Sequence, residues 1–231
     1  MVATVSIVSF MESMLISFVR GMATPRKPKV IYVEGNVGAG KTEIMAAMKK
    51  CLTDKDYTVM VFNEETEFWD HENLLQDMLD RPGDRAAKRA FEALGPLRQF
   101  ITRAHFIEKC GSEYDYIFLE RHPTTTIEVF GADKAVSALF ETVHASFPFM
   151  DSPKTTVYVK ASPKICLERI IARGLERERG MDFAYIKDLD TKHSAMMLAR
   201  RSVGCTIVAV DCNRENIAAV AGDACAELLP A

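Results

Sequence analysis

The chain has 231 residues, a length that suits one domain with a sizeable core. Its formal net charge of −3 excludes a strongly basic protein that nucleic acid or anionic lipid would attract through its overall field. The six cysteines are scattered without a C-x-x-C pair, which argues against a disulfide framework or a zinc site. We therefore expect reduced thiols and an intracellular, cytoplasmic protein.

Residues 1–28 are predicted to form an N-terminal extension of unknown role, with the domain at 29–231. Val2–Val19 is rich in apolar residues, but serines interrupt it and Glu12 lies near its middle. A membrane span is therefore not predicted. The cleavage site of a secretory signal is not evident, and the arginine content usual in mitochondrial targeting is low, although mitochondrial import stays open.

Short apolar runs alternate with longer helical patterns along the rest of the chain. The predicted strands are Val30–Val33, Tyr57–Phe62, Tyr116–Leu119, Thr155–Val159 and Thr206–Val210. The predicted helices are 41–53, 71–80, 84–110, 125–147, 162–175, 182–200 and 213–228. This alternation predicts an α/β fold: a five-stranded parallel sheet with helices on both faces. Ligands of such sheets lie beyond the carboxyl ends of the strands.

The first predicted strand leads into a phosphate-binding loop. Residues 35–42 match Gly-x-x-x-x-Gly-Lys-[Ser/Thr], and a helical segment follows them. Main-chain N–H groups of such a loop surround phosphate oxygens, the lysine neutralises the phosphates, and the hydroxyl binds magnesium. The sequence thus predicts an ATP site formed by Gly35, Asn36, Val37, Gly38, Ala39, Gly40, Lys41 and Thr42.

Charged residues directly follow two of the predicted strands. Glu64 lies just beyond the strand that ends at Phe62, and Glu120-Arg121 follows Leu119. One carboxylate can take a proton from an acceptor hydroxyl, another can hold magnesium, and the arginine can stabilise the transferring phosphate. The alternatives are a solvated loop carboxylate for Glu64 and a surface ion pair for Glu120-Arg121.

Three arginines, Arg169, Arg173 and Arg177, recur at a spacing of four residues and are predicted to share one helical face. A salt-bridged exposed helix would explain them, but they follow the fourth strand and are mixed with Gly174 and Gly180. We interpret the segment as an arginine-rich lid that closes over the triphosphate.

Together these motifs resemble the deoxynucleoside kinase family over about residues 29–215. The marks are Glu-Gly-Asn-x-Gly-x-Gly-Lys-Thr at 34–42, Glu-x-x-Glu-x-Trp at 64–69, Gln99, Glu-Arg at 120–121 and Arg-Gly-x-x-x-Glu at 173–178. The resemblance implies a P-loop kinase that uses ATP and Mg²⁺ and forms a homodimer. The compact, divergent sequence is also similar to viral thymidine kinases of this branch.

Residue roles follow from the resemblance by position. It implies that Glu64 is the general base for the 5′-hydroxyl, that Arg121 binds near that hydroxyl and the incoming phosphate, and that Glu120 supports magnesium. The lid arginines would contact phosphates.

The resemblance also implies a nucleoside site. Gln99 would bind the edge of the base, because its amide is both donor and acceptor. Phe130 and Trp69 would flank the base, although without the resemblance core aromatics would be the preferred interpretation of both, and Glu178 would contact the 3′-hydroxyl.

The chain departs from the family pattern at several positions. His122-Pro123 follows Glu-Arg where serine is usual, and Leu79 replaces a sugar-binding tyrosine. Phe106 and Thr126 fall where members that accept purines and deoxycytidine have a charged pair. This difference predicts thymidine as the preferred substrate, with deoxycytidine second.

Two other functions fit the phosphate loop. A thymidylate kinase would phosphorylate a nucleotide, but it would be expected to have Asp-Arg after the third strand and would not need Glu64. A non-catalytic nucleotide-binding module would bind nucleotide without turnover that depends on a nucleoside.

Overall fold

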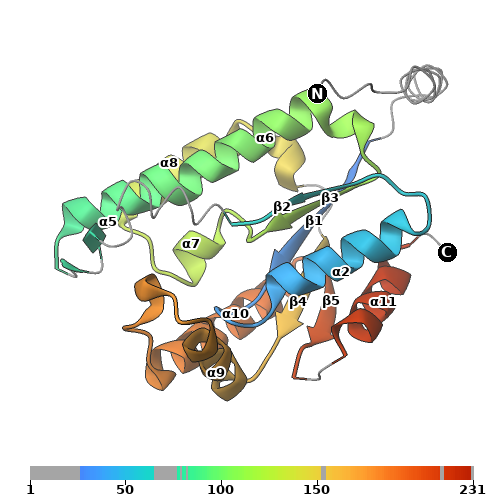
Figure 1. The fold of residues 1–231 in the computed structure, drawn as a ribbon. Helices are drawn as coiled ribbons and strands as arrows, with labels where there is room; N and C mark the ends of the chain where they lie inside the picture. Colours follow the sequence, from blue (N-terminus) through green and yellow to red (C-terminus); the bar gives the residue numbers. More distant parts are fainter. Residues whose placement is uncertain are drawn as a thin grey trace, which may run out of the picture.

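The computed structural model describes residues 27–64, 77–78, 80–81, 83–151, 155–213 and 216–229. In this part of the chain five parallel strands form one sheet in the order β2-β3-β1-β4-β5 (Figure 1). The strands are β1 (Lys29–Glu34), β2 (Val59–Phe62), β3 (Tyr116–Glu120), β4 (Thr155–Lys160) and β5 (Thr206–Asp211). Each of them overlaps a predicted strand, and the predicted α/β class is confirmed.

The described helices connect and cover these strands. They are α2 (Lys41–Thr53), α5 (Arg85–Glu92), α6 (Arg98–Cys110), α7 (Thr125–Glu128), α8 (Lys134–Ala145), α9 (Pro163–Arg173), α10 (Phe183–Ser202) and α11 (Ile217–Leu228). Short 3₁₀ turns lie at Gly111–Glu113, Pro148–Asp151 and Glu176–Glu178.

The sheet is buried on both faces, as its apolar strands predict. Ile31 and Val33 of β1 pack into a core with α2, α9 and α11, whereas Val30 and Tyr32 pack into a second core with α6. Successive side chains of a strand point to opposite faces, so one short apolar strand supplies both cores. Figure 1 shows α2 and α11 on one side of the sheet and α6 and α8 on the other.

The strand order reverses beside β1, which is the position at which open α/β sheets bind ligands. β1 pairs with β3 on one side and with β4 on the other, and Val33 lies opposite Glu120 in this register. The carboxyl ends of β1 and β3 therefore lie side by side. The residues that follow them, at 35–42 and 121–123, meet at one edge of the sheet.

Three helix predictions differ from the structure in instructive ways. The helix predicted over 125–147 is interrupted, because Gly131 has a φ of 69° and the Asp133 carboxylate caps α8 at Ala135 N. The helix predicted over 84–110 contains a π-helical turn at Ala93–Leu97, where Pro96 lacks an N–H. Residue Gly174, with a φ of 62°, ends α9.

Some predictions lie outside the described residues. These are the extension up to residue 26, Trp69, Leu79 and most of the helix predicted over 71–80. The division of the chain at residue 28 and the homodimer stay predictions.

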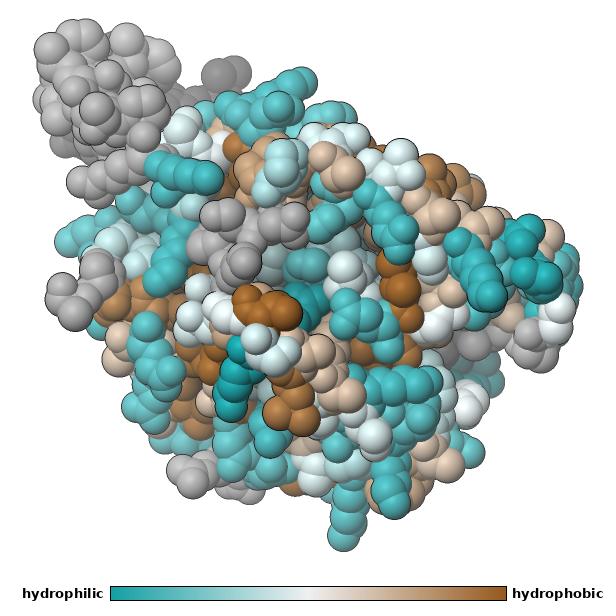
Figure 2. Space-filling model, turned by 180° about the vertical axis from the view of Figure 1, so that it is seen from behind, coloured by the Kyte–Doolittle hydropathy of each residue, from teal (hydrophilic) through white to brown (hydrophobic). Residues whose placement is uncertain are grey.

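The surface is mixed in character. Figure 2 shows hydrophilic and hydrophobic residues interspersed on the face seen from behind. In the part of the chain that the structure describes, no helix combines the length and the apolar character needed to cross a bilayer.

Candidate active site

The phosphate loop is held in place by its own asparagine. The Asn36 side chain donates to Ile186 O of α10 at 2.8 Å and accepts from Val37 N at 2.8 Å. A Cβ at Gly35 would lie 2.4 Å from Val159 O, and one at Gly38 would lie 2.5 Å from a carbonyl oxygen of α9. The loop can approach β4 and α9 this closely only because both positions are glycine.

Lys41 is buried at the start of α2 and points back into the loop. Its Nζ donates to Asn36 O at 3.0 Å and lies 3.7 Å from Glu120 Oε1. Burial lowers the pKa of Lys41, and the nearby Arg121 adds to this, while Glu120 acts in the opposite direction. Glu120 only partly neutralises the ammonium group of Lys41. At the end of the phosphate loop this group can therefore bind a phosphate oxygen.

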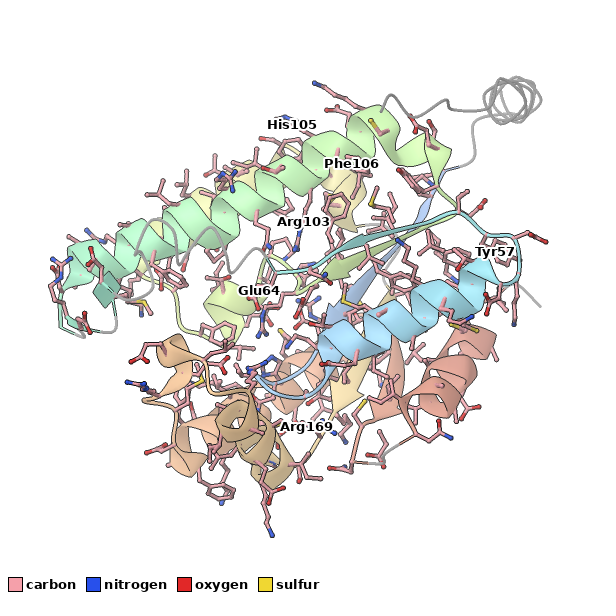
Figure 3. All side chains as sticks on the ribbon, in the orientation of Figure 1. Tyr57, Glu64, Arg103, His105, Phe106 and Arg169 are labelled. Atoms are coloured by element: carbon pink, nitrogen blue, oxygen red, sulfur yellow. The ribbon has the colours of Figure 1, made fainter. Side chains whose placement is uncertain are left out.

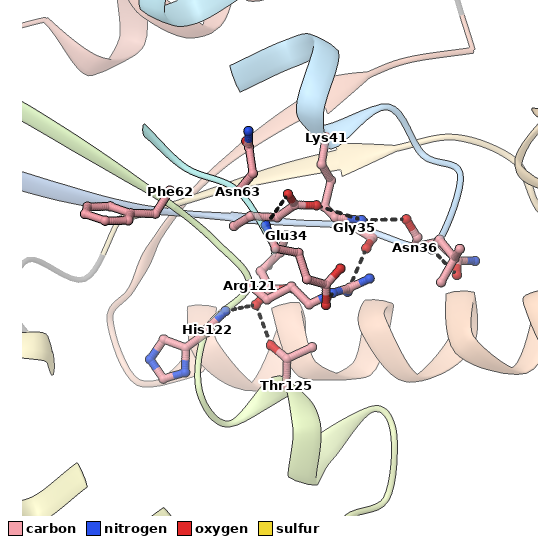
Figure 4. Close-up of polar contacts among 12 residues, drawn as sticks. Glu34, Gly35, Asn36, Lys41, Phe62, Asn63, Arg121, His122 and Thr125 are labelled. Carbon is pink, nitrogen blue, oxygen red and sulfur yellow. Dashed lines mark hydrogen bonds and ion pairs between the residues drawn. The ribbon is translucent and has the colours of Figure 1, made fainter. Parts of the chain in front are cut away.

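Glu64 and Arg121 form an ion pair at the ends of β2 and β3. Arg121 Nε donates to Glu64 Oε1 at 2.8 Å, and Arg121 Nη1 donates to Gly35 O at 3.3 Å. Although burial acts to lower the pKa of Arg121, the surrounding carboxylates, Glu64 foremost, raise it overall. One arginine thus connects the predicted base to the predicted phosphate loop; Figure 4 shows Arg121 beside Gly35.

Glu120 lies between these two groups. Its Oε2 accepts from Glu64 N at 3.0 Å, and its Oε1 faces Lys41. Burial alone would raise the pKa of Glu120, but Lys41 and then Arg121 outweigh it and lower the pKa. The carboxylate is therefore ionised at neutral pH, as a magnesium ligand must be.

The turn after β3 depends on Glu34, a residue that the sequence analysis did not assign to the site. Glu34 is fully buried, and its Oε1 accepts from His122 N at 2.6 Å and from the Thr125 hydroxyl (Figure 4). Arg121, the residue directly before His122, has a φ of 64°. This left-handed conformation is strained for a residue with a side chain. A carboxylate at the end of an apolar strand was the available signal, the same one that identified Glu120.

A cavity of about 980 Å³ joins the phosphate loop to the ends of β2 and β3. Of the predicted site, its lining includes Val37, Gly38, Gly40, Lys41, Thr42, Glu64, Gln99, Glu120, Arg121, Thr126, Phe130, Arg173 and Glu178. Phe130 also lies under Arg121, whose Cζ is 4.9 Å from the centre of the ring. The structure therefore brings residues from widely separated segments to one cavity.

Gln99 and Arg103, one turn apart on α6, form the polar part of its wall. Gln99 Nε2 donates to Asn63 O at 3.3 Å, and Arg103 donates to Asn63 O and Glu120 O, each at 2.7 Å. Arg103 is buried and is drawn with Glu64 in Figure 3. Sequence reasoning missed Arg103, although its spacing of four residues from Gln99 puts both on one helix face.

The structure does not bring Phe106 to the cavity. Phe106 packs edge-on against Phe62, with ring centres 5.0 Å apart, and also contacts Tyr114 (Figure 3). It shares a helix face with Gln99 but lies seven residues further along, which is roughly 10 Å along the axis. The charged residue one turn from Gln99 on α6 is Arg103, which does line the cavity.

The lid arginines Arg169 and Arg173 make different contacts. Arg169 donates to Ala39 O at 3.1 Å and to Cys212 O at 2.8 Å, so it braces the phosphate loop from outside the cavity. Arg173 lines the cavity and makes a two-point ion pair with Glu178, with Nε to Oε2 at 2.6 Å. Because α9 ends at Arg173, the expectation that Arg177 continues the same helical face is wrong.

Thr42 and Glu120 are the residues that the sequence predicts to hold magnesium. Among the described residues no group of three or more His, Cys, Asp or Glu side chains is placed to hold a metal ion. Thr42 and Glu120 line the cavity beside Lys41. Magnesium bound with substrate phosphates usually takes one or two protein oxygens and several waters, and this pair supplies such oxygens.

Comparison with known proteins identifies the family. The family model described as deoxynucleoside kinase matches residues 31–225. A deoxyguanosine kinase of Dictyostelium discoideum is 22% identical over 80% of this chain and 64% of its own length. A probable deoxycytidine kinase of fowlpox virus is 27% identical over 71% of this chain and 70% of its own length. The deoxycytidine kinase of Mus musculus is 24% identical over 74% and 76%, respectively.

The match covers the sheet, the phosphate loop, the Glu64–Arg121 pair and the lid, and it omits only the ends of the chain. The chain spans 64% of the length of the first of these relatives. By its matching segment and its fold, this chain belongs to the deoxynucleoside kinase family.

Proposed function

We propose that this protein transfers the γ-phosphoryl group of ATP to the 5′-hydroxyl of a deoxynucleoside, giving the 5′-monophosphate and ADP for nucleotide salvage. Thymidine is the proposed acceptor, with deoxycytidine second. One observation carries the proposal: a carboxylate–arginine pair, Glu64 and Arg121, lies in the same cavity as the phosphate loop and contacts it.

The pair suits transfer to a neutral hydroxyl. Glu64 uses Oε1 to accept from Arg121, and its Oε2 has no hydrogen bond or ion pair with another described residue. That oxygen can accept the proton that a 5′-hydroxyl loses as its oxygen attacks phosphorus. Arg121, held by Glu64 and Gly35 O, provides positive charge where the equatorial phosphate oxygens gather negative charge.

The donor half of the site is provided by the loop and its neighbours. Lys41 would bind β- and γ-phosphate oxygens, and the loop N–H groups would bind the others. Thr42 and Glu120 would hold Mg²⁺, which supplies charge neutralisation at the phosphates. Arg173 would reach the phosphates from the lid once its pairing with Glu178 is exchanged for them.

The acceptor half contains a base-binding amide. Gln99 Nε2 is held by Asn63 O, so its Oε1 is placed to accept from an N–H of the base. Thymine offers such a hydrogen at N3, and cytosine offers one at its amino group, so Gln99 alone admits both. The relatives named deoxycytidine kinase support deoxycytidine as the second acceptor.

A panel of acceptors tests the proposal. The purified protein is incubated with ATP and Mg²⁺ and with thymidine, deoxycytidine, deoxyadenosine, deoxyguanosine or thymidine monophosphate, and ADP formation is measured. We expect the highest kcat/KM with thymidine. Turnover with thymidine monophosphate alone would instead identify a nucleotide kinase, and ATP binding without turnover would identify a non-catalytic module.

The variant Glu64→Gln tests the assignment of the base. It keeps the shape of the side chain but removes its basicity, so we expect kcat to fall by roughly 10²–10⁴-fold. ATP affinity, measured by calorimetry, should stay within about threefold, because a lost proton acceptor does not alter the phosphate loop. Glu113→Gln, at an exposed position in the 3₁₀ turn after α6, is the matched control. Near-normal kcat in Glu64→Gln would remove Glu64 from the role of base.

A further inference from the structure

His122 places an imidazole ring at the inner end of the cavity. Its ring packs edge-on against Tyr32, with centres 4.4 Å apart, and both residues line the cavity together with Phe100 and Met150. The main chain of His122 is fixed by Glu34, as described above. The ring is therefore held from two sides, by the sheet beneath it and by the turn that carries it.

The hydrogen bonds of Nδ1 determine which ring nitrogen carries the hydrogen. Thr124 N donates to His122 Nδ1 at 3.1 Å, so Nδ1 is an acceptor. The Thr124 hydroxyl lies 2.9 Å from the same nitrogen and itself accepts from Arg200 Nη2 at 2.7 Å. With its lone pair directed to Arg200, this hydroxyl directs its hydrogen to Nδ1. In the neutral ring the hydrogen is consequently on Nε2.

With Nδ1 occupied as an acceptor by these two donors, Nε2 presents one N–H donor and no acceptor. It has no hydrogen-bond partner among the described residues, and it is not one of the enclosed polar atoms that lack a partner. The donor therefore faces the cavity.

We propose that His122 Nε2–H donates to a ring carbonyl oxygen of the nucleobase and makes the site selective for 2,4-dioxopyrimidine deoxynucleosides. This inference rests on the proposed function and names a determinant of its specificity. Thymine presents O2 and O4 on either side of N3–H, so O4 can accept from His122 while Gln99 Oε1 accepts from N3–H. Cytosine keeps O2 but has an amino group in place of O4, so the donor of His122 would meet another donor and stay unpaired.

Two variants separate the ring nitrogens. In His122→Asn the amide oxygen can take the place of Nδ1 and accept from Thr124 N, while the donor at Nε2 is lost. In His122→Gln the amide nitrogen reaches the place of Nε2 and keeps the donor. We expect His122→Asn to lower kcat/KM for thymidine by roughly 5- to 150-fold, the range for an unpaired buried polar group. For deoxycytidine we expect a change of less than about threefold, and His122→Gln should retain most of the preference for thymidine.

A second experiment compares substrate analogues, and its first part uses the wild-type enzyme alone. Thymidine is compared with 2-thiothymidine and 4-thiothymidine, in which one carbonyl becomes a weak acceptor. We expect 4-thiothymidine to lose kcat/KM in the wild-type enzyme, and its ratio to thymidine to approach one in His122→Asn, whereas a loss confined to 2-thiothymidine would overturn the contact with O4. A penalty caused by the size of sulfur would instead persist in the variant.

The outcomes separate this inference from the proposed function. Wild-type turnover with thymidine, together with an equal loss for all nucleosides in His122→Asn, would overturn the role of His122 and leave the kinase assignment standing. Equal use of thymidine and both thio analogues by the wild type would also overturn it. Absence of turnover with every nucleoside would overturn the proposed function itself.

Discussion

The buried imidazole of His193 should make the stability of this fold depend on pH. His193 lies on α10 with no exposed surface, and its Nδ1 is 2.8 Å from Leu189 O, an acceptor, so Nδ1 carries the hydrogen. Burial, aided by the charge of Arg121, lowers the pKa of His193 from 6.5 to about 3. The ring therefore stays neutral in the folded protein across the ordinary pH range.

The sign and size of the effect follow from proton binding. Below pH 6.5 the unfolded chain protonates this histidine, whereas the folded chain does so only near pH 3. Because the unfolded state then binds more protons, the free energy of unfolding falls as the pH decreases through this window. Between pH 7.5 and 5.5 these two pKa values give a loss of about 1.4 kcal/mol. His122, whose pKa is also lowered, adds to the loss in the wild type.

Urea unfolding at pH 7.5, 6.5 and 5.5 measures the effect, with the free energy extrapolated to water at each pH. We compare the wild type with His193→Met, which fills the site with an apolar side chain that does not titrate. The variant should lose about 1.4 kcal/mol less than the wild type between pH 7.5 and 5.5. His105→Gln, at an exposed position on α6, should lose as much as the wild type. An unchanged pH dependence in His193→Met would refute the argument.

Two further substitutions test the framework of the site. Arg103→Met removes the side-chain donor to Glu120 O, whereas Asn63 O keeps the donor of Gln99. Urea unfolding should therefore show a loss of about 1–3 kcal/mol, the cost of one unpaired carbonyl; a loss under about 1 kcal/mol would show that water replaces the guanidinium. Gly38→Ala forces a Cβ to within 2.5 Å of a carbonyl oxygen of α9 at a φ of 75°, so ATP affinity measured by calorimetry should fall more than tenfold. Gly83→Ala, with nothing within 4 Å of its Cβ position, should bind ATP normally, and equal affinity in the two variants would contradict the close-packing argument.

The sheet could be predicted from sequence because each of its strands carries its own signal. A strand that is buried on both faces must be apolar along its length, and in this chain such runs are short and well separated. Val30–Val33 and Tyr116–Leu119 therefore appear as strands before any pairing is known, and the observed strands extend each of them by a residue or more. The residues that follow the strands, among them Glu64 and Glu120, could be assigned to one edge of the sheet for the same reason.

Helix ends were harder to predict because they depend on single residues. Gly131 and Gly174 both adopt a left-handed conformation and end a helical segment, whereas Gly95 lies within the π-helical turn. Glycine is compatible with all of these environments, so composition alone does not separate them. Asp133, as an N-cap directly before α8, was the more reliable indication of the break.

The wall of the cavity was predicted only in part, because spacing along a helix gives the face but not the depth. Gln99, Arg103 and Phe106 lie on one side of α6, but only the first two line the cavity. Phe106 packs instead against Phe62 of β2. The extent of the cavity therefore depends on pairing between distant segments, which a single sequence does not reveal.

The geometry of the proposed active site depends on the pairing of β1 with β3. Val33 lies opposite Glu120, and Arg121 N continues the ladder by donating to Val33 O at 3.0 Å. The strained turn that follows is held by Glu34, the last residue of β1. The strand that carries the phosphate loop thus also fixes the arginine that faces it. A shift of one residue between these strands would separate Arg121 from Gly35 O, so the same ladder that builds the sheet aligns the donor and acceptor halves of the site.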